Sequence, residues 1–259
     1  MTQLGTLLDF SGKTVLITGG ARGAGADIVR QFARTGANVA FTYHNGAEDA
    51  QALVAELRAS GVNAQAFPHD QSDISAAPAL LDAIEASFGT VDYLVNNAGI
   101  YPACPVMDIT EDAWDTMLDC NTKGVFFLSR EAAKRMKNGG AIVNISSINA
   151  TNPAGKLVHY GVSKAALEMM TRCMAQSFGP MGVRVNCVAP GLIWREGQEQ
   201  YIPGWRESYC ERAPLGRLVY AEEVGNTCAF LCSPLSSAIT GQVLTVDCGV
   251  LLAPCFDNR

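Results

Sequence analysis

The sequence has few charged residues and no long apolar run. Only 17% of its 259 residues are charged, and the formal net charge is -6 at pH 7. No basic run is long enough to neutralise several phosphates, so we expect no nucleic-acid partner. No apolar run reaches the roughly 18 residues that a membrane helix requires, and the start of the chain lacks the pattern of a secretory signal. We therefore expect no membrane partner and a cytoplasmic location.

Paired cysteine motifs are also missing. The nine cysteines include no Cys-x-x-Cys pair, and their odd number does not suit a disulfide framework. Most lie in apolar stretches, as reduced and buried cysteines do, which favours a reducing cytosol. The three histidines fall on separate segments without ligand spacing, so we expect no metal site.

What is present is a large apolar fraction in alternating short and long segments. With 48% hydrophobic residues, the chain can bury a sizeable core in one large domain, residues 1–259. Short β-branched runs alternate with longer helical segments, which is typical of βα units. The sequence predicts an α/β fold, a single-domain Rossmann-type doubly wound parallel sheet of about seven strands with helices on both faces. The expected strands are 14–18, 38–43, 63–68, 93–96, 141–146, 184–189 and 243–246, and the expected helices are 25–35, 47–60, 74–88, 111–137, 156–178 and 221–232.

A glycine-rich turn follows the first expected strand. Gly19, Gly23 and Gly25 lie where the strand ends and a helix begins, with Ala24 between the last two. Backbone amides at such a turn, together with a helix N-terminus, can hold a pyrophosphate. The first gap between glycines is wider than in the common dinucleotide fingerprint, so an ordinary glycine-rich turn remains the alternative.

The end of the second expected strand bears on the choice of cofactor. A dinucleotide fold usually places an acid there for the adenosine ribose, but this chain has no acid before Glu48. Arg22 could pair with a 2′-phosphate through its forked guanidinium, helped by Thr42, Tyr43 or His44. The sequence therefore favours NADP(H) and leaves NAD(H) as the alternative, in which Arg22 is merely exposed to solvent.

A phenol and an ammonium in the middle of the chain are spaced for proton chemistry. Tyr160 and Lys164 are four residues apart, which puts both on one face of a helix. The phenol has an unperturbed pKa of about 10, and the charges of Lys164 and of an oxidised nicotinamide would lower it. Ser147 ends the fifth expected strand, where its hydroxyl could hold a carbonyl oxygen. Tyr and Lys at this spacing more often mark a helix surface; their occurrence with the glycine turn and Ser147 favours catalysis.

Four motifs occur in order along nearly the whole chain. They are the turn at 18–25, the segment Asn-Asn-Ala-Gly at 96–99, Ser147 with Tyr160 and Lys164, and the Pro-Gly pair at 190–191. With these motifs the chain resembles the classical short-chain dehydrogenase/reductase family, and within it the NADP-dependent ketoreductases such as 3-oxoacyl-(acyl-carrier-protein) reductases. The resemblance implies that Tyr160 is the acid/base, that Lys164 lowers its pKa and holds the nicotinamide ribose, and that Ser147 orients the substrate. It also implies that Asn121 supports a water-mediated proton relay.

The same resemblance implies a set of cofactor contacts. Asp70 matches the acid that contacts the adenine ring, and Asn97 lies beside the cofactor. Many relatives have a threonine four residues after the glycine of Pro-Gly, where it touches the nicotinamide carboxamide. This chain has Arg195 at that position, and the arginine either binds an anionic substrate or faces solvent. The expected cofactor residues are Gly19, Arg22, Gly23, Ala24, Gly25, Tyr43, His44, Asp70, Gln71, Asn97, Ala98, Gly99, Tyr160, Lys164, Pro190, Gly191 and Ile193.

The substrate region is the least determined by sequence. Residues 190–218 are rich in Gly, Pro, Trp and Tyr and form our candidate substrate lid. By position, a mixture of aromatic and polar residues is expected at the pocket, which suggests a moderately polar, ring-bearing substrate. The expected substrate residues are Tyr101, Asn149, Thr151, His159, Trp194 and Arg195.

These observations predict an NADP(H)-dependent carbonyl reductase or alcohol dehydrogenase that transfers hydride between nicotinamide and a ketone or secondary alcohol. The alternatives are an NAD-dependent alcohol, sugar or steroid dehydrogenase and, less favoured, a non-catalytic nucleotide-sensing scaffold. The resemblance implies a homotetramer that acts on a small-molecule substrate. A small basic group, Lys134, Arg135 and Lys137, gives only weak support for an acyl-carrier protein as partner.

Overall fold

The computed structural model describes residues 8–194 and 204–252, and these residues form one seven-stranded sheet. All neighbouring strands are parallel, in the order β3-β2-β1-β4-β5-β6-β7. Strands β1, β4, β5 and β6 are almost wholly buried, which is why their sequences are mostly apolar. The strands are β1 (Thr14–Ile17), β2 (Asn38–Tyr43), β3 (Ala64–Pro68), β4 (Tyr93–Asn96), β5 (Gly140–Ile145), β6 (Val183–Pro190) and β7 (Val243–Val246).

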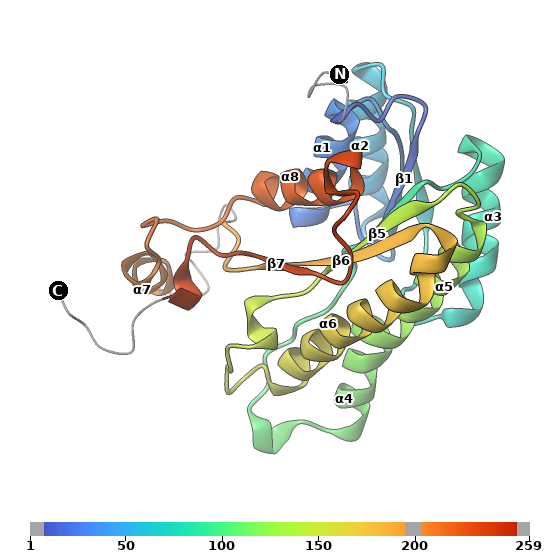
Figure 1. Cartoon of the computed structure of the whole chain (residues 1–259). Helices are drawn as coiled ribbons and strands as arrows, with labels where there is room; N and C mark the ends of the chain where they lie inside the picture. The colour runs from blue at the N-terminus through green and yellow to red at the C-terminus, as the bar shows by residue number, and fades with distance from the viewer. Residues whose placement is uncertain (1–7, 195–203, 253–259) are drawn as a thin grey trace.

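Helices cover both faces of this sheet (Figure 1). One apolar core joins the sheet to α1 (Gly23–Arg34), α2 (Ala47–Ala59) and α8 (Ala221–Cys232). A second core joins it to α3 (Ala77–Phe88), α5 (Gly124–Arg135) and the longer α6 (Val158–Phe178). The predicted fold class is confirmed, because two separate cores on opposite faces define a doubly wound sheet.

The strand order reverses between β1 and β4. These strands pair directly, with Ile17 beside Val95, although α1, β2, α2, β3 and α3 lie between them in sequence. The loops that leave their carboxyl ends therefore diverge to opposite sides. Ligands of open α/β sheets bind in the crevice at such a switch point, and the glycine turn and the segment 97–99 lie there.

Two predicted segments differ from the structure. The helix expected at 111–137 is divided into α4 (Glu111–Leu118), a π-helical turn (Asp119–Lys123) and α5. The stretch 190–218 contains an eight-residue helix, α7 (Trp205–Arg212), where no regular structure was expected. The rest of the candidate lid lies partly outside the described residues, because 195–203 are not described. The other predicted strands and helices are confirmed with small shifts at their ends.

Candidate functional site

The turn after β1 is shaped by close backbone packing. Gly19 and Gly23 have φ angles of 64° and 58°, a conformation that glycine adopts without strain. A β-carbon at Gly25 would collide with the carbonyl oxygen of Gly19 and lie 2.6 Å from Nδ2 of Asn97. Helix α1 then begins without a side-chain cap and without an acidic residue in its first turn. Its first N–H groups are thus available to an anion, and the turn fits the pyrophosphate of a dinucleotide.

Uncharged side chains hold this turn against its neighbours. The Oγ1 atom of Thr18 accepts hydrogen bonds from the backbone N–H groups of Asn97 and Ala98, at 3.0 and 2.9 Å. Nδ2 of Asn97 donates to the carbonyl oxygens of Thr18 and Gly19, at 2.9 and 3.1 Å. Oγ1 of Thr42 accepts from the Gly19 N–H at 3.1 Å and is itself buried. Asn97 and Ala98 therefore adjoin the turn, whereas the buried Thr42 hydroxyl supports the turn from the side of β2.

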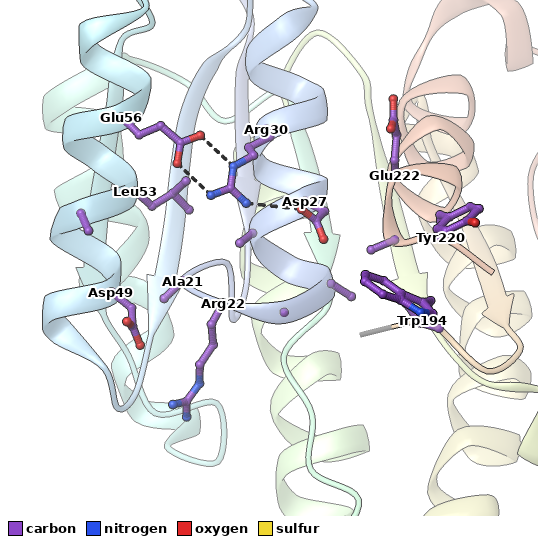
Figure 2. Close-up of a pocket in the computed structure, with 16 residues that line it drawn as sticks. Ala21, Arg22, Asp27, Arg30, Asp49, Leu53, Glu56, Trp194, Tyr220 and Glu222 are labelled. Atoms are coloured by element: carbon purple, nitrogen blue, oxygen red, sulfur yellow. Dashed lines mark hydrogen bonds and ion pairs between the residues drawn. The ribbon is translucent and has the colours of Figure 1, made fainter. Parts of the chain in front are cut away.

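Arg22 is exposed at the edge of a pocket of about 710 Å³ between α1, α2 and the start of α8. Figure 2 shows its side chain extending away from Arg30, whose guanidinium is paired with Glu56 at 2.7 Å and Asp27 at 3.3 Å. In the described part of the chain, Arg22 has no such ion pair. Its charge is available to an anionic ligand beside the glycine turn.

The expected adenosine end gathers residues from β2 and the loop after β3. Nε2 of His44 lies 3.9 Å from Oδ2 of Asp70, and both side chains are largely exposed. Oδ1 of Asp70 accepts hydrogen bonds from the hydroxyl and the N–H of Ser72, and these lower the pKa of that carboxyl. Tyr43 is half-buried at the end of β2. Gln71 is buried, and its carboxamide has no hydrogen-bond partner among the described residues.

The predicted phenol and ammonium lie together at the start of α6. Nζ of Lys164 is 5.7 Å from the centre of the Tyr160 ring. The lysine is 4% exposed and donates a hydrogen bond of 2.8 Å to the carbonyl oxygen of Ile145, the last residue of β5. Burial lowers the pKa of Lys164 to about 8, because the charged form loses its hydration.

The two serines after β5 make different contacts. Ser147 begins a short 3-10 turn, and its Oγ accepts from the Asn149 N–H at 3.1 Å. Ser146 points its hydroxyl inward, to Oε1 of Glu168 at 3.0 Å. The Ser146 hydroxyl is therefore occupied by a buried carboxyl group. Ser147 is the serine whose hydroxyl lies in the loop after β5.

Asn121 lies in the π-helical turn and is fully buried. Its Nδ2 donates to the Ile100 carbonyl at 2.9 Å and to Oγ of Ser163 at 3.1 Å, while its Oδ1 accepts from the Ile100 N–H at 2.9 Å. A β-carbon at Gly99 would lie 3.1 Å from Oδ1 of Asn121 and 3.5 Å from Nζ of Lys164. Asn121, Gly99 and Lys164 are thus brought together. The π-helical turn, which sequence reasoning missed, is a common feature of functional sites.

The expected substrate residues do not form one group. Tyr101 is 55% exposed and packs edge-on to Tyr160, with ring centres 6.1 Å apart. His159, in contrast, is 1% exposed, so its imidazole is enclosed by protein and does not face an open pocket. Trp194 lines the Figure 2 pocket beside the glycine turn. Asn149 and Thr151 lie in and just after the 3-10 turn that Ser147 begins, and Arg195 lies outside the described residues.

The Pro-Gly pair lies at the carboxyl end of β6, beside the end of β7. Pro190 is the last residue of β6, and Gly191 donates to the Val246 carbonyl at 2.9 Å. Ile193 forms an isolated bridge with Val219 and lines the same pocket as Arg22.

Within residues 8–194 and 204–252, no three His, Cys, Asp or Glu side chains are grouped to hold a metal ion. No helix in this part of the chain has both the length and the apolar character that crossing a membrane requires.

Comparisons with known proteins agree with this arrangement. Residues 19–251 match the family model described as enoyl-(acyl carrier protein) reductase. The chain is 35% identical to 3-oxoacyl-[acyl-carrier-protein] reductase FabG of Staphylococcus aureus, over 93% of this chain and 98% of that protein. It is 36% identical to 3beta-hydroxysteroid dehydrogenase 1 of Eggerthella lenta, over 96% and 97%.

Solved structures give the same result. A short chain dehydrogenase from Burkholderia cenocepacia in complex with NADP is 37% identical to this chain and has a TM-score of 0.88, over 93% of this chain and 99% of that one. A match of this extent in sequence and in structure covers both the glycine turn and the segment with Ser147, Tyr160 and Lys164. The chain is therefore an oxidoreductase that belongs to the short-chain dehydrogenase/reductase family.

Proposed function

We propose that this protein is an NADP(H)-dependent carbonyl reductase or alcohol dehydrogenase. The observation that carries the proposal is the pairing of Tyr160 with a buried Lys164, next to the Ser147 loop and across from an anion-binding glycine turn. The bound nicotinamide supplies a hydride in reduction and accepts one in oxidation. A hydride and a proton together convert a ketone to a secondary alcohol, so the protein must supply the proton.

In this proposal each side chain has a distinct task. The phenol of Tyr160 gives a proton to the substrate oxygen in reduction and removes it in oxidation. The hydroxyl of Ser147 holds that oxygen. Lys164 places a positive charge near the phenol and so favours the phenolate. Only one of its three N–H donors is used by Ile145, which leaves the others for a ribose hydroxyl. Asn121 orients the Ile100 backbone and supports the proton relay.

The preference for NADP(H) rests on charge at the adenosine end. Arg22 is exposed, unpaired within the described residues, and adjacent to the glycine turn. The end of β2 offers Tyr43 and His44 and no acid, so nothing on that strand would repel a 2′-phosphate. The similar Burkholderia structure contains NADP, which agrees with this choice.

Assembly and carrier-protein binding receive unequal support. Val162 and Met169 on α6 are apolar and exposed, which supports the homotetramer as part of our proposal. The basic group of Lys134, Arg135 and Lys137, at and just after the end of α5, gives no comparable support for an acyl-carrier protein. Lys134 is paired with Glu131 at 2.9 Å, and Arg135 with Asp82 at 2.6 Å. Because two of the three charges are paired within the chain, we propose a small-molecule ketone or alcohol as the substrate.

Cofactor titration of the Arg22→Ala variant tests the proposal. We expect wild-type protein to bind NADPH more tightly than NADH, and Arg22→Ala to weaken NADPH binding by about 10- to 100-fold, the value of a charge-assisted hydrogen bond or two. The affinity for NADH should change less than about twofold. Nicotinamide fluorescence measures both affinities.

Thr42→Val is the matched control for this experiment. Its hydroxyl is occupied by the Gly19 N–H, so the variant should weaken NADPH and NADH by the same factor. Equal losses of NADPH and NADH affinity in Arg22→Ala would contradict the NADP(H) preference. A selective loss of NADPH affinity in Thr42→Val would show that Thr42 contacts the 2′-phosphate and would contradict the role proposed for Arg22.

A further inference from the structure

Helix α7 contributes one buried side chain to the rest of the protein. Tyr209 is the only buried residue of this eight-residue helix and is 3% exposed, and the half-buried Cys210 packs against the same core. Figure 1 shows α7 set apart from the helices that flank the sheet, beside the segment that follows β7. The contacts of Tyr209 are therefore central to how α7 is held.

The hydroxyl of Tyr209 lies between the ends of β6 and β7. It donates a hydrogen bond of 2.7 Å to the carbonyl oxygen of Asp247, the residue after β7. Burial raises the pKa of Tyr209 to about 12, against the opposing effect of the nearby Leu192 backbone N–H. The hydroxyl consequently stays protonated, and able to donate, throughout the pH range in which the enzyme would work.

Asp247 is itself fixed by its surroundings. Its carboxylate accepts hydrogen bonds from the N–H groups of Gly249 and Leu251, at 2.8 and 2.9 Å. The residue is 8% exposed. The Asp247 carbonyl is thus a rigid anchor, and the hydrogen bond from Tyr209 sets the distance between α7 and β7.

The same hydroxyl explains why residue 191 is glycine. Gly191 has no positive φ, so its backbone does not require glycine. A β-carbon there would instead overlap the Tyr209 hydroxyl oxygen and lie 3.0 Å from the Cα of Asp247. Gly191 and Tyr209 are therefore matched in shape, and the Pro-Gly turn lies directly against the side chain that anchors α7.

We propose that Tyr209 is a positioning residue, which holds the turn formed by Pro190, Gly191 and Leu192 in the shape that receives the nicotinamide half of the cofactor. The inference rests on the proposed function, because it requires a dinucleotide in the crevice. Without the hydroxyl, the Asp247 carbonyl is left without this partner, and the turn gains freedom that cofactor binding must remove.

The test is Tyr209→Phe, which keeps the ring and removes only the hydroxyl. Two ligands are titrated against the full-length protein: NADPH, and 2′,5′-ADP, which has the adenosine half but no nicotinamide. We expect NADPH affinity to fall by about 5- to 30-fold, as for loss of one buried hydrogen bond, while 2′,5′-ADP affinity changes less than about twofold. Equal weakening of both ligands would show a general structural role, and no weakening of either would show that the hydroxyl positions nothing; each result overturns the proposal.

Tyr93→Phe is the matched control. Tyr93 is a half-buried tyrosine at the first residue of β4, at the opposite end of the strands. It should leave both affinities unchanged. If wild-type protein binds neither NADPH nor NADH, the proposed function fails. If wild-type protein binds NADPH but Tyr209→Phe does not weaken NADPH more than 2′,5′-ADP, the inference alone fails.

A double-mutant cycle sharpens the test. Gly191→Ala adds a methyl group where the Tyr209 hydroxyl lies, so it should weaken NADPH binding in the wild-type background. In the Tyr209→Phe background the hydroxyl is gone, and the loss caused by Gly191→Ala should be smaller by at least about threefold. Strictly additive losses would contradict a direct coupling between the two residues.

Discussion

The turn after β1 and the start of α6 both lie near the segment 97–99 but are built from different interactions. At the turn, Thr18, Thr42 and Asn97 exchange hydrogen bonds with backbone groups, and none of the three is charged. At α6, a lysine is buried with one backbone acceptor, and burial lowers its pKa to about 8. The first region depends on backbone shape and should be indifferent to pH. The second depends on protonation and should respond to it.

The largest expected effect is loss of turnover in Tyr160→Phe. The phenylalanine keeps the ring that packs against Tyr101 but has no proton to transfer. Because general acid-base catalysis contributes about 10²- to 10⁴-fold, we expect ketone reduction to fall by about 10³-fold or more. NADPH affinity, measured by fluorescence, should change by less than about threefold. Turnover within about tenfold of wild type would show that another group supplies the proton, whereas wild-type protein that binds NADPH but shows no turnover would favour the nucleotide-sensing alternative.

Gly25→Ala should have the next largest effect, on cofactor binding. The added methyl group would collide with the Gly19 carbonyl and approach the Asn97 amide, so the turn must open. We expect NADPH affinity to fall by about 100-fold, equivalent to about 2.7 kcal/mol. Gly179→Ala is the control, because a β-carbon at Gly179 meets nothing within 4 Å. An unchanged dissociation constant in Gly25→Ala would refute the shape argument for this turn.

The smallest effect is a pH dependence of stability that comes from Lys164. Below pH 8 the lysine is protonated in both the folded and the unfolded chain, and the buried charge destabilises the fold. Between pH 8 and 10.5 the folded chain releases the proton while the unfolded chain keeps it, so the free energy of unfolding rises with pH. Between pH 7 and 9.5 this group should add about 2 kcal/mol.

Urea unfolding of wild-type protein and of Lys164→Met, each at pH 7 and at pH 9.5, measures the contribution of Lys164 to the free energy of unfolding. Titrating groups that do not interact with Lys164 are shared by the two proteins and cancel in the difference. The free energy of unfolding of wild type should rise relative to that of Lys164→Met as the pH increases. A difference that stays constant, or that changes in the other direction, would contradict the lowered pKa of Lys164.

Much of the site followed from local sequence. The glycine turn, the i, i+4 spacing of Tyr160 and Lys164, and the alternating strands and helices are short-range features. Each is set by backbone conformation, helix geometry or the burial of adjacent residues. The resemblance to the family also distinguished Ser147 from Ser146, and the hydrogen bond from Ser146 to Glu168 agrees with that choice.

Other features required contacts between distant segments. The helical pattern at 111–137 gave no sign of the π-helical turn, which places Asn121 against Ile100 and Ser163. Nothing local indicated that the Thr42 hydroxyl would be used by Gly19, or that His159, next to Tyr160, would be enclosed.

The sequence by itself determined the fold class, and it singled out the glycine turn and the residues proposed for proton chemistry, because those depend on neighbours within a few positions along the chain. Only the tertiary structure decided how the turn is held by Thr18 and Asn97, where α7 is anchored, and why Gly191 must leave room for Tyr209. The hydrogen bonds among these contacts join residues that are 38 to 80 positions apart in the sequence. Their geometry is set by the packing of strands and helices, which local sequence patterns do not encode.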